Sequence, residues 1–383
     1  MTLQNELSGP VMCVVGARPN FMKMAPILRA LASHRPPIKA MLVHTGQHYD
    51  AAMSDKLFAD LRLPQPGINL EVGSGSHAVQ TAEVMKRFEP ALDEHKPACV
   101  LVVGDVNSTL ACTLVAVKKG VPVVHVEAGL RSYDRKMPEE INRVLTDQVA
   151  DRLYTTERSA LANLVREGVD ASRVCFAGNV MIDSLLSNRE QARPAADSLR
   201  AHGADPALVQ QAGGYGVVTL HRPSNVDDAE TLRSLLGALN EVAQKLPLVF
   251  ALHPRTRANI DRFGLSALLD PVRMVILPPQ GYLEMVGLMM GATLVLTDSG
   301  GLQEETTALG VPCLTMRENT ERPITVEQGT NTMVGRDVQA IRDGVAEILS
   351  GRGKRGRVPE LWDGHAAERI AADLYQWLRA GAH

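Results

Sequence analysis

Residues 11–44, VMCVVGARPNFMKMAPILRALASHRPPIKAMLVH, decide the class of fold. The stretch opens with the apolar run VMCVV (11–15) and closes with IKAMLVH (38–44), and both runs are typical of buried parallel strands. Between them, apolar residues from Phe21 to Leu31 recur at the spacing of an amphipathic helix. A strand, a helix and a second strand in this order predict the β-α-β unit of a parallel sheet.

The same alternation continues along the chain. Helical spacing covers 77–92 and 107–119, and a polar, Ala-rich stretch at 188–212 marks a linker. The remaining strand-like runs are CVLVVG (99–104), VPVVHV (121–126), YGVVTL (215–220), LPLVFALH (246–253), VRMVIL (272–277), ATLVLT (292–297) and VPCLTM (311–316). We therefore predict an α/β protein of two Rossmann-like doubly wound domains, residues 1–190 and 191–365, with a helix at 366–383 that packs back on the first.

The composition excludes several classes of partner. Hydrophobic residues make up 45% of the 383 residues and charged residues 22%, the balance of a globular protein, and the formal net charge is -3. No global positive field is present to attract nucleic acid or an anionic membrane surface. No apolar run approaches the roughly 20 residues that span a bilayer. We expect neither a nucleic-acid partner nor a membrane partner.

The five cysteines form no C-x-x-C pair, so neither a zinc site nor redox chemistry is indicated. Buried free thiols fit a reducing compartment. The N-terminal stretch MTLQNELSGPVMCVVG has no basic region or cleavage site of a signal peptide. We expect a cytoplasmic protein.

Ligands of open α/β sheets bind beyond the carboxyl ends of the strands, so the polar residues that follow each apolar run matter most. The first run is followed by Gly16, Arg18 and Lys23, without the G-x-G-x-x-G of a dinucleotide site. A basic pair at a strand-to-helix turn suits a diphosphate or another leaving anion. The alternative is that both are solvated charges at the start of a helix.

Three acids follow later strands of the first domain: Asp105, Glu127 and Glu139. Carboxylates that converge on one crevice raise one another's pKa and so supply the proton acceptor and donor of acid/base catalysis. Asp105 has a second interpretation, as the N-cap of the helix near Asn107. A metal site is the rival for all three, but no motif such as H-E-x-x-H supports it.

The second domain places His221 after its first strand and His253 after its second. The stretch TDSGGLQEE (297–305) is the strongest single signal, because a strand ends there in a small-residue turn and a helix begins. The backbone N–H groups at Ser299, Gly300 and Gly301 could hold a pyrophosphate. Glu305 suits ribose hydroxyls, and the loop 317–323, which contains Arg322, adds cationic contacts.

The order of these motifs resembles the non-hydrolysing UDP-N-acetylglucosamine 2-epimerase family. The likeness runs over nearly the whole chain, through GARPNFMKMAPI, TGQHYD, GDVNSTLA, HVEAGLRS, MPEEINR, GNVMIDSL, TLHRPSN, TDSGGLQEE, MRENTERPITVEQGT and WDGHA. It implies the glycosyltransferase B architecture, two Rossmann-like domains with the active site between them. It also implies a homodimer, a UDP sugar as substrate, and no cofactor or metal.

The resemblance implies reversible C2 epimerisation of UDP-N-acetylglucosamine to UDP-N-acetylmannosamine. UDP leaves by anti elimination to give 2-acetamidoglucal, and then re-adds. Carried over by motif, the catalytic residues are Asp105, Glu127, Glu139, His221, Arg18 and Lys23. The UDP-binding residues are Arg18, His253, Ser299, Gly300, Gly301, Glu305 and Arg322.

Some members of the family bind a second substrate molecule as an activator. The corresponding residues here are Gln47, His48 and Arg222, but Asp50 and Pro223 stand where those members have Gln and Arg. TGQHYD and HRPSNVD also resemble branches that epimerise other UDP sugars, including UDP-2,3-diacetamido-glucuronates. The residues leave three rival functions open: a glycosyltransferase of the same architecture, a hydrolysing epimerase and a non-catalytic UDP-sugar sensor.

Overall fold

The computed structural model describes residues 7–46 and 57–381. The chain divides into two compact units, Met1–Ser187 with Glu360–His383, and Asn188–Pro359. Each unit contains one parallel sheet, of 7 strands in the first and 6 in the second. Among the described residues, no helix is both long and apolar enough to cross a membrane.

The sheet of the first unit has the order β3-β2-β1-β4-β5-β6-β7, and all its neighbours pair in parallel. Every residue of β1, β4 and β5 is buried, as the continuous apolar runs predict. The strands are β1 (Val11–Val15), β2 (Ala40–His44), β3 (Ile68–Asn69), β4 (Cys99–Val103), β5 (Val123–Ala128), β6 (Arg152–Thr155) and β7 (Val174–Phe176).

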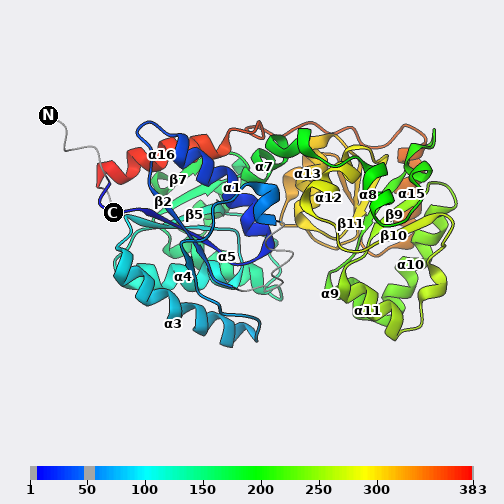
Figure 1. Cartoon of the computed structure of the whole chain (residues 1–383). Coiled ribbons are helices and arrows are strands. Elements are labelled where there is room, and N and C mark those ends of the chain that lie inside the picture. The colour runs from blue at the N-terminus through cyan, green and yellow to red at the C-terminus, as the bar shows by residue number, and fades with distance from the viewer. Residues whose placement is uncertain (1–6, 47–56, 382–383) are drawn as a thin grey trace. The chain divides into compact units, whose positions relative to one another are not determined.

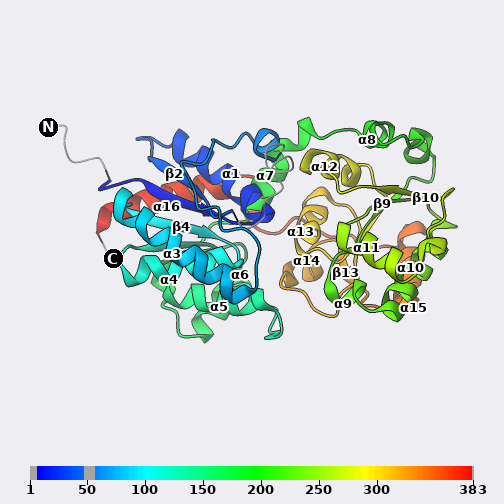
Figure 2. The ribbon, with the colours of Figure 1, turned by 60° about the horizontal axis from the view of Figure 1, so that its bottom comes forward.

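Helices cover both faces of this sheet (Figure 1). Figures 1 and 2 show α1 beside α16 on one face and α3, α4 and α5 on the other. Phe88 and Leu92 of α3 pack in one apolar cluster with Val100 of β4. The helices are α1 (Arg18–Ser33), α3 (His77–His95), α4 (Asn107–Lys118), α5 (Pro138–Val149), α6 (Arg158–Arg166), α7 (Val180–Asn188) and α16 (Ala366–Ala380).

The second unit repeats the doubly wound plan, with strand order β10-β9-β8-β11-β12-β13. Consecutive residues of β8 enter different cores, because side chains alternate along a strand: Val217 lies in one apolar cluster with Leu199 and Leu288, and Val218 in another with Leu235 and Ile341. The strands are β8 (Gly216–Thr219), β9 (Leu248–Ala251), β10 (Met274–Leu277), β11 (Leu294–Thr297), β12 (Cys313–Thr315) and β13 (Asn331–Met333).

The helices of the second unit surround this sheet. They are α8 (Ala195–Ala201), α9 (Pro223–Val226), α10 (Ala229–Ala243), α11 (Pro254–Arg262), α12 (Tyr282–Met290), α13 (Gly300–Leu309), α14 (Pro323–Glu327) and α15 (Val338–Leu349). The predicted class, two Rossmann-like α/β sheets of doubly wound order, is confirmed.

Each sheet has one point where the strand order reverses. In the first unit it lies between β1 and β4, and in the second between β8 and β11. The loops after these strands diverge to opposite faces and leave a crevice at the carboxyl edge, where open α/β sheets bind ligands. The residues after β1, β4, β8 and β11 are therefore the first candidates for a binding site.

The chain returns to the first unit earlier than predicted, at Glu360 rather than at residue 366. Trp362 is buried, and its indole N–H donates to the carbonyl of Thr156 at 3.1 Å. The Asp183 carboxylate accepts from the backbone N–H groups of Ala366 and Ala367, at 3.2 and 2.7 Å. The buried indole and the Asp183 contacts at the start of α16 therefore hold the segment 360–365 on the first unit. The sequence WDGHA, with one apolar side chain large enough to anchor it, did not indicate this contact.

Gly178 provides a test of this return segment. It has φ +93°, and a Cβ there would collide with the Leu361 carbonyl, whereas Gly168 has a similar φ of +85° and no atom within 4 Å of its Cβ position. Gly168→Ala should cost about 1–2 kcal/mol of unfolding free energy for the left-handed conformation alone. Gly178→Ala should cost about 1–3 kcal/mol more from the added steric conflict. Urea unfolding of the two variants measures the difference. Equal losses of unfolding free energy would mean that the segment 360–365 moves aside without cost.

Candidate active site

The loop after β1 is tied to the end of β4 by Asn20. Its side-chain carbonyl accepts from the backbone N–H groups of Gly16 and Ala17, at 3.1 and 3.0 Å, and its amide donates to the Val103 carbonyl at 3.0 Å. Asn20 thus bridges the two strands that flank the reversal point. Arg18, the first residue of α1, is half-buried beside it in sequence.

Lys23 forms a buried ion pair with Glu127. The Nζ atom lies 2.7 Å from each carboxylate oxygen, and the two side chains are 7% and 2% exposed. Gly104 packs against the pair, because a Cβ on this glycine would lie 3.0 Å from Lys23 Nζ. The alternative in which Lys23 is a solvated charge is therefore wrong, and its ammonium group is held at the reversal point of the sheet.

Glu127 lies on a strained piece of backbone. Its φ is +73°, and the pairing of β5 with β6 shifts register between Val126 and Ala128. A left-handed conformation costs about 1–2 kcal/mol for a residue with a side chain, and such strain clusters at functional sites. The bulge places Glu127 one residue out of the regular alternation of the strand, so its carboxylate meets Lys23.

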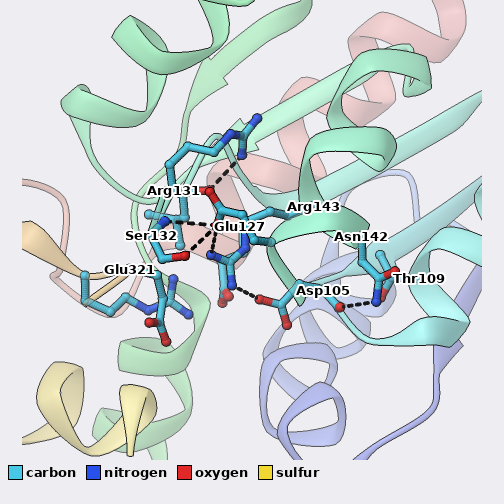
Figure 3. A network of polar contacts seen from close by, with 12 residues as sticks. Asp105, Thr109, Glu127, Arg131, Ser132, Asn142, Arg143 and Glu321 are labelled. Carbon is cyan, nitrogen blue, oxygen red and sulfur yellow. Dashed lines mark hydrogen bonds and ion pairs between the residues drawn. The ribbon is translucent and has the colours of Figure 1, made fainter. Parts of the chain in front are cut away.

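Asp105 binds Arg143 rather than capping a helix. Its Oδ2 lies 2.5 Å from Arg143 Nη2, and Asn142 Nδ2 donates to its backbone carbonyl at 2.9 Å (Figure 3). Helix α4 has Val106 at its N-cap and no side-chain capping bond, so the N-cap interpretation of Asp105 is wrong. Arg143 and Asn142 both come from α5, which therefore sets the position of Asp105.

Two consecutive acids at the start of α5 have different surroundings. Glu140 is buried, accepts from the backbone N–H groups of Ser132 and Tyr133, at 2.9 Å each, and pairs with Arg143 Nη1 at 2.7 Å. Glu139 is half-buried and has no hydrogen bond or ion pair with the part of the chain that the structure describes. Of the three predicted acids, Asp105 and Glu127 thus face a buried cation and Glu139 does not.

In the second unit, Asp298 organises the loop after β8. It accepts from the backbone N–H groups of His221 and Arg222, and its Oδ1 lies 2.8 Å from His221 Nδ1. Burial raises the pKa of Asp298, but the hydrogen bonds and charge of His221 and the other donors outweigh it, so the net pKa is lowered. The His221 and His253 rings are 5.7 Å apart, and desolvation followed by the neighbouring His221 lowers the pKa of His253.

This lowered pKa of Asp298 predicts a pH-dependent stability. A carboxyl group with a depressed pKa in the folded state contributes stability that is present above its unfolded value of about 3.9 and is lost as pH falls through the folded value. Asp298→Asn should therefore lower the free energy of unfolding at neutral pH by on the order of 3 kcal/mol, and the melting temperature with it. The difference in melting temperature between the variant and the wild type should become smaller below about pH 4. Melting curves of the two proteins from neutral to acidic pH measure this difference. A difference that does not change with pH would refute the lowered pKa of Asp298 in the folded protein.

Helix α13 opens the predicted diphosphate site. Ser299 is its N-cap without a side-chain capping bond, and no acidic residue lies in its first turn. Gly300 lies against Glu321, since a Cβ there would be 2.5 Å from the carboxylate. Arg317 donates to Glu321 at 2.8 Å, and Arg222 Nη2 lies 3.9 Å from it. Two cations, the Glu321 carboxylate between them and a helix N-terminus thus lie close together.

The remaining predicted residues of the second unit lie on the same helix or beside it. Arg322 Nε is 3.0 Å from a Glu304 carboxylate oxygen, and both side chains are buried. Glu305 is also buried. Burial, and then the charge of Glu305, raise the pKa of Tyr282, so the two side chains are neighbours. Gly301 is the second residue of α13.

Sequence reasoning missed Asn20, Arg143 and Asp298. All three lie inside the motifs quoted above, and Arg143 is one helical turn after Glu140, a spacing at which opposite charges pair. The predicted activator residues Gln47 and His48 lie outside the described residues. Within the described ranges, no group of three or more His, Cys, Asp or Glu side chains is placed to hold a metal ion.

Comparison with known proteins identifies the family. A family model described as UDP-N-acetylglucosamine 2-epimerase matches residues 30–375. The chain belongs to this family. The UDP-N-acetylglucosamine 2-epimerase of Methanocaldococcus jannaschii is 40% identical over 364 residues, 94% of this chain and 97% of that protein. A crystal structure of the Methanocaldococcus jannaschii enzyme in complex with UDP-GlcNAc and UDP matches with a TM-score of 0.86 at 39% identity, over 96% of this chain and 99% of that chain.

A second sugar occurs among equally similar relatives of this 2-epimerase family. The UDP-2,3-diacetamido-2,3-dideoxy-D-glucuronate 2-epimerase of Pseudomonas aeruginosa is also 40% identical, over 95% of this chain and 99% of that protein. The glycosyltransferase B class of fold predicted from the sequence is confirmed by the structural neighbours. The names of the relatives agree on an epimerase that acts at C2 and differ on the sugar.

Proposed function

We propose that the chain interconverts UDP-N-acetylglucosamine and UDP-N-acetylmannosamine by anti elimination of UDP and re-addition, without a cofactor. The observation that carries the proposal is the set of three carboxylates in a chain of the 2-epimerase family: Asp105 follows β4, Glu127 lies near the end of β5, before Ala128, and Glu139 lies in the first turn of α5. Proton transfer at C2 needs an acceptor and a donor, and carboxyl groups at such an edge supply both.

In the first step a carboxylate takes the proton from C2. The electrons of the C2–H bond form a C1=C2 double bond, and the C1–O bond breaks with its electron pair going to the diphosphate of UDP. The reverse step protonates C2 on the other face as the diphosphate oxygen re-adds to C1. One acid must therefore be ionised while another carries a proton. Arg143 and Lys23 lie beside Asp105 and Glu127, whereas Glu139 has no cation partner among the described residues.

The second unit supplies the groups suited to UDP. The N-terminus of α13 at Ser299, Gly300 and Gly301, with the dipole of the helix, favours the diphosphate, and Glu305 suits the ribose hydroxyls. Arg322 adds positive charge, and His221 and His253 add ring nitrogens that can form hydrogen bonds. The proposal assigns Arg18 and Lys23 of the first unit to the departing diphosphate.

Arg18→Ala tests the leaving-group role. Negative charge on the diphosphate grows toward the transition state, so a cation that stabilises it acts on kcat more than on KM. Loss of such a contact should raise the barrier by about 2–4 kcal/mol. Steady-state kinetics measure the split. A rise in KM with unchanged kcat would assign Arg18 to ground-state binding instead.

Incubation with UDP-N-acetylglucosamine alone tests the function itself. We expect intact UDP-N-acetylmannosamine by chromatography, with no acceptor present. A requirement for an acceptor would favour a glycosyltransferase, free N-acetylmannosamine and UDP would favour a hydrolysing epimerase, and binding without turnover would favour a sensor. Because two relatives of equal identity are named for different sugars, a panel that includes the UDP-2,3-diacetamido-glucuronate decides the substrate.

We further propose a cytoplasmic homodimer, on the family likeness and the cysteine usage. The proposed activator site would include Arg222, whose Nε donates to the Asp298 carbonyl at 3.4 Å, together with Gln47 and His48. Rate measurements over a range of substrate concentrations test activation, since an activated enzyme gives a sigmoidal curve. Equilibrium sedimentation tests the dimer.

A further inference from the structure

A fully buried histidine of β5, His125, contacts the backbone before Asp105 and lies two residues before Glu127. Its Nε2 is 2.8 Å from the carbonyl of Gly104, the residue before Asp105. Its Nδ1 is 2.6 Å from Asp147 Oδ1. The other oxygen of Asp147 accepts from the backbone N–H of Gly129, two residues after Glu127, at 3.0 Å. The proposed reaction assigns no role to this chain of contacts.

Counting donors and acceptors fixes the charge of the ring. A carbonyl oxygen can only accept, so Nε2 of His125 must carry a proton. Asp147 accepts from the Gly129 N–H and lies 2.8 Å from Arg131 Nη1, so it is ionised and also requires a donor at Nδ1. His125 therefore carries both protons, as an imidazolium. The next charged groups are Glu167, which pairs with Arg131, and the Lys23–Glu127 pair against Gly104.

Both ends of this chain of contacts hold unusual backbone. Gly104 has φ +66° and Gly129 has φ +78°, and Glu127, two residues before Gly129, also has a left-handed φ of +73°. A strained segment keeps one geometry only when its surroundings over-determine it. The imidazolium joins the carbonyl before Asp105 to the carboxylate that fixes the turn after Glu127, so it couples the two acids through the backbone.

We propose that His125 is a positioning residue, an imidazolium that holds Asp105 and Glu127 in the relative geometry that proton transfer at C2 needs. This role rests on the proposed function. The protonation state does not, and it can be measured without substrate.

Neutron diffraction from deuterium-exchanged wild-type crystals tests the protonation state directly. Deuterium on both ring nitrogens of His125 is the expected result, and deuterium on only one of them would overturn the proposal. This measurement stands even if every His125 variant fails to fold. It also separates the outcomes: a wild-type protein inert toward UDP sugars would refute the proposed function, while the ring protons would still decide the charge of His125.

Two isosteric variants test the positioning. The side-chain amide of Asn occupies the place of Nδ1 and that of Gln the place of Nε2, so His125→Asn loses the contact to Gly104 and His125→Gln loses the contact to Asp147. We expect each to lower kcat at least ~10-fold, because small displacements of reacting groups cost up to roughly 100-fold. The Kd for UDP, whose proposed site is in the second unit, should change less than about 3-fold.

Asp373→Asn is the matched control. Asp373 binds Arg152 and Tyr154 of β6 in the same unit, at 2.6 and 2.7 Å, and lies outside the proposed site. It should lower the melting temperature while leaving kcat unchanged. If both His125 variants keep kcat within about 3-fold of wild type, His125 only stabilises the fold. The same conclusion follows if Asp373→Asn, at the melting temperature of the His125 variants, loses as much kcat as they do.

Discussion

Glu139→Gln is expected to lower kcat for C2 epimerisation more than ~100-fold, the contribution typical of a positioned acid or base. The substitution keeps the size of the side chain and removes its ability to exchange a proton. Among the three acids, Glu139 has no cation partner within the described residues, so no ion pair is broken and folding should be preserved. We expect a loss of the same order for Asp105→Asn or Glu127→Gln. At least two of the three variants should therefore lose more than ~100-fold of the wild-type kcat.

Deuterium entry from D2O and scrambling of labelled phosphate oxygens report the same step independently of the equilibrium. In the wild type, product should carry deuterium at C2, and bridging and non-bridging oxygens should exchange as the C1–O bond breaks. Both signals should decline with kcat in the acid variants. Glu89→Gln, an exposed carboxyl of α3 that is paired with Lys119, should leave them unchanged. Epimerisation without deuterium entry and without scrambling would exclude elimination.

Lys23→Met is expected to damage both catalysis and stability. The barrier should rise by about 2–4 kcal/mol through loss of charge at the leaving group. The free energy of unfolding should fall by about 3–5 kcal/mol, because the buried Glu127 carboxylate loses the cation that contacts both of its oxygens. Stopped assays and urea unfolding measure the two losses separately.

The double variant Lys23→Met/Glu127→Gln distinguishes the two effects. Removing both charges leaves no buried carboxylate that has lost the Lys23 ammonium, so the free energy of unfolding should recover toward wild type while kcat stays low. Non-additivity of this kind is the mark of a directly coupled pair. Additive losses of stability would mean that Lys23 and Glu127 do not depend on each other, contrary to their contact distance of 2.7 Å.

The doubly wound order and the polar strand ends could be predicted because they follow from local pattern. Buried parallel strands give continuous apolar runs, and the ligand edge follows from topology. The short strands β6, β7 and β13 were not predicted, since RLYT, VCF and NTM are too short to show a period. Such strands form because a neighbouring strand already offers its backbone groups.

The pairing of charges could not be predicted for a different reason. Arg143 reaches Asp105 across 38 residues and Lys23 reaches Glu127 across 104, and no spacing rule links partners that are so far apart in sequence. The left-handed backbone of Glu127 could not be predicted either, because a positive φ is normally predicted from a glycine in the sequence. Residue types at strand ends predicted the place of the site, and tertiary packing decided which carboxylates meet a cation.

The return of the chain at Glu360 has a consequence for the order of assembly during synthesis. Residues 188–359 form a unit of continuous chain that can complete its core once they have left the ribosome. The unit made first cannot, because Ile370 and Leu374 of α16 are fully buried in it and Asp373 binds Arg152. The sheet that carries Asp105 and Glu127 therefore waits for α16, and the nascent protein completes the core of the second unit before that of the first.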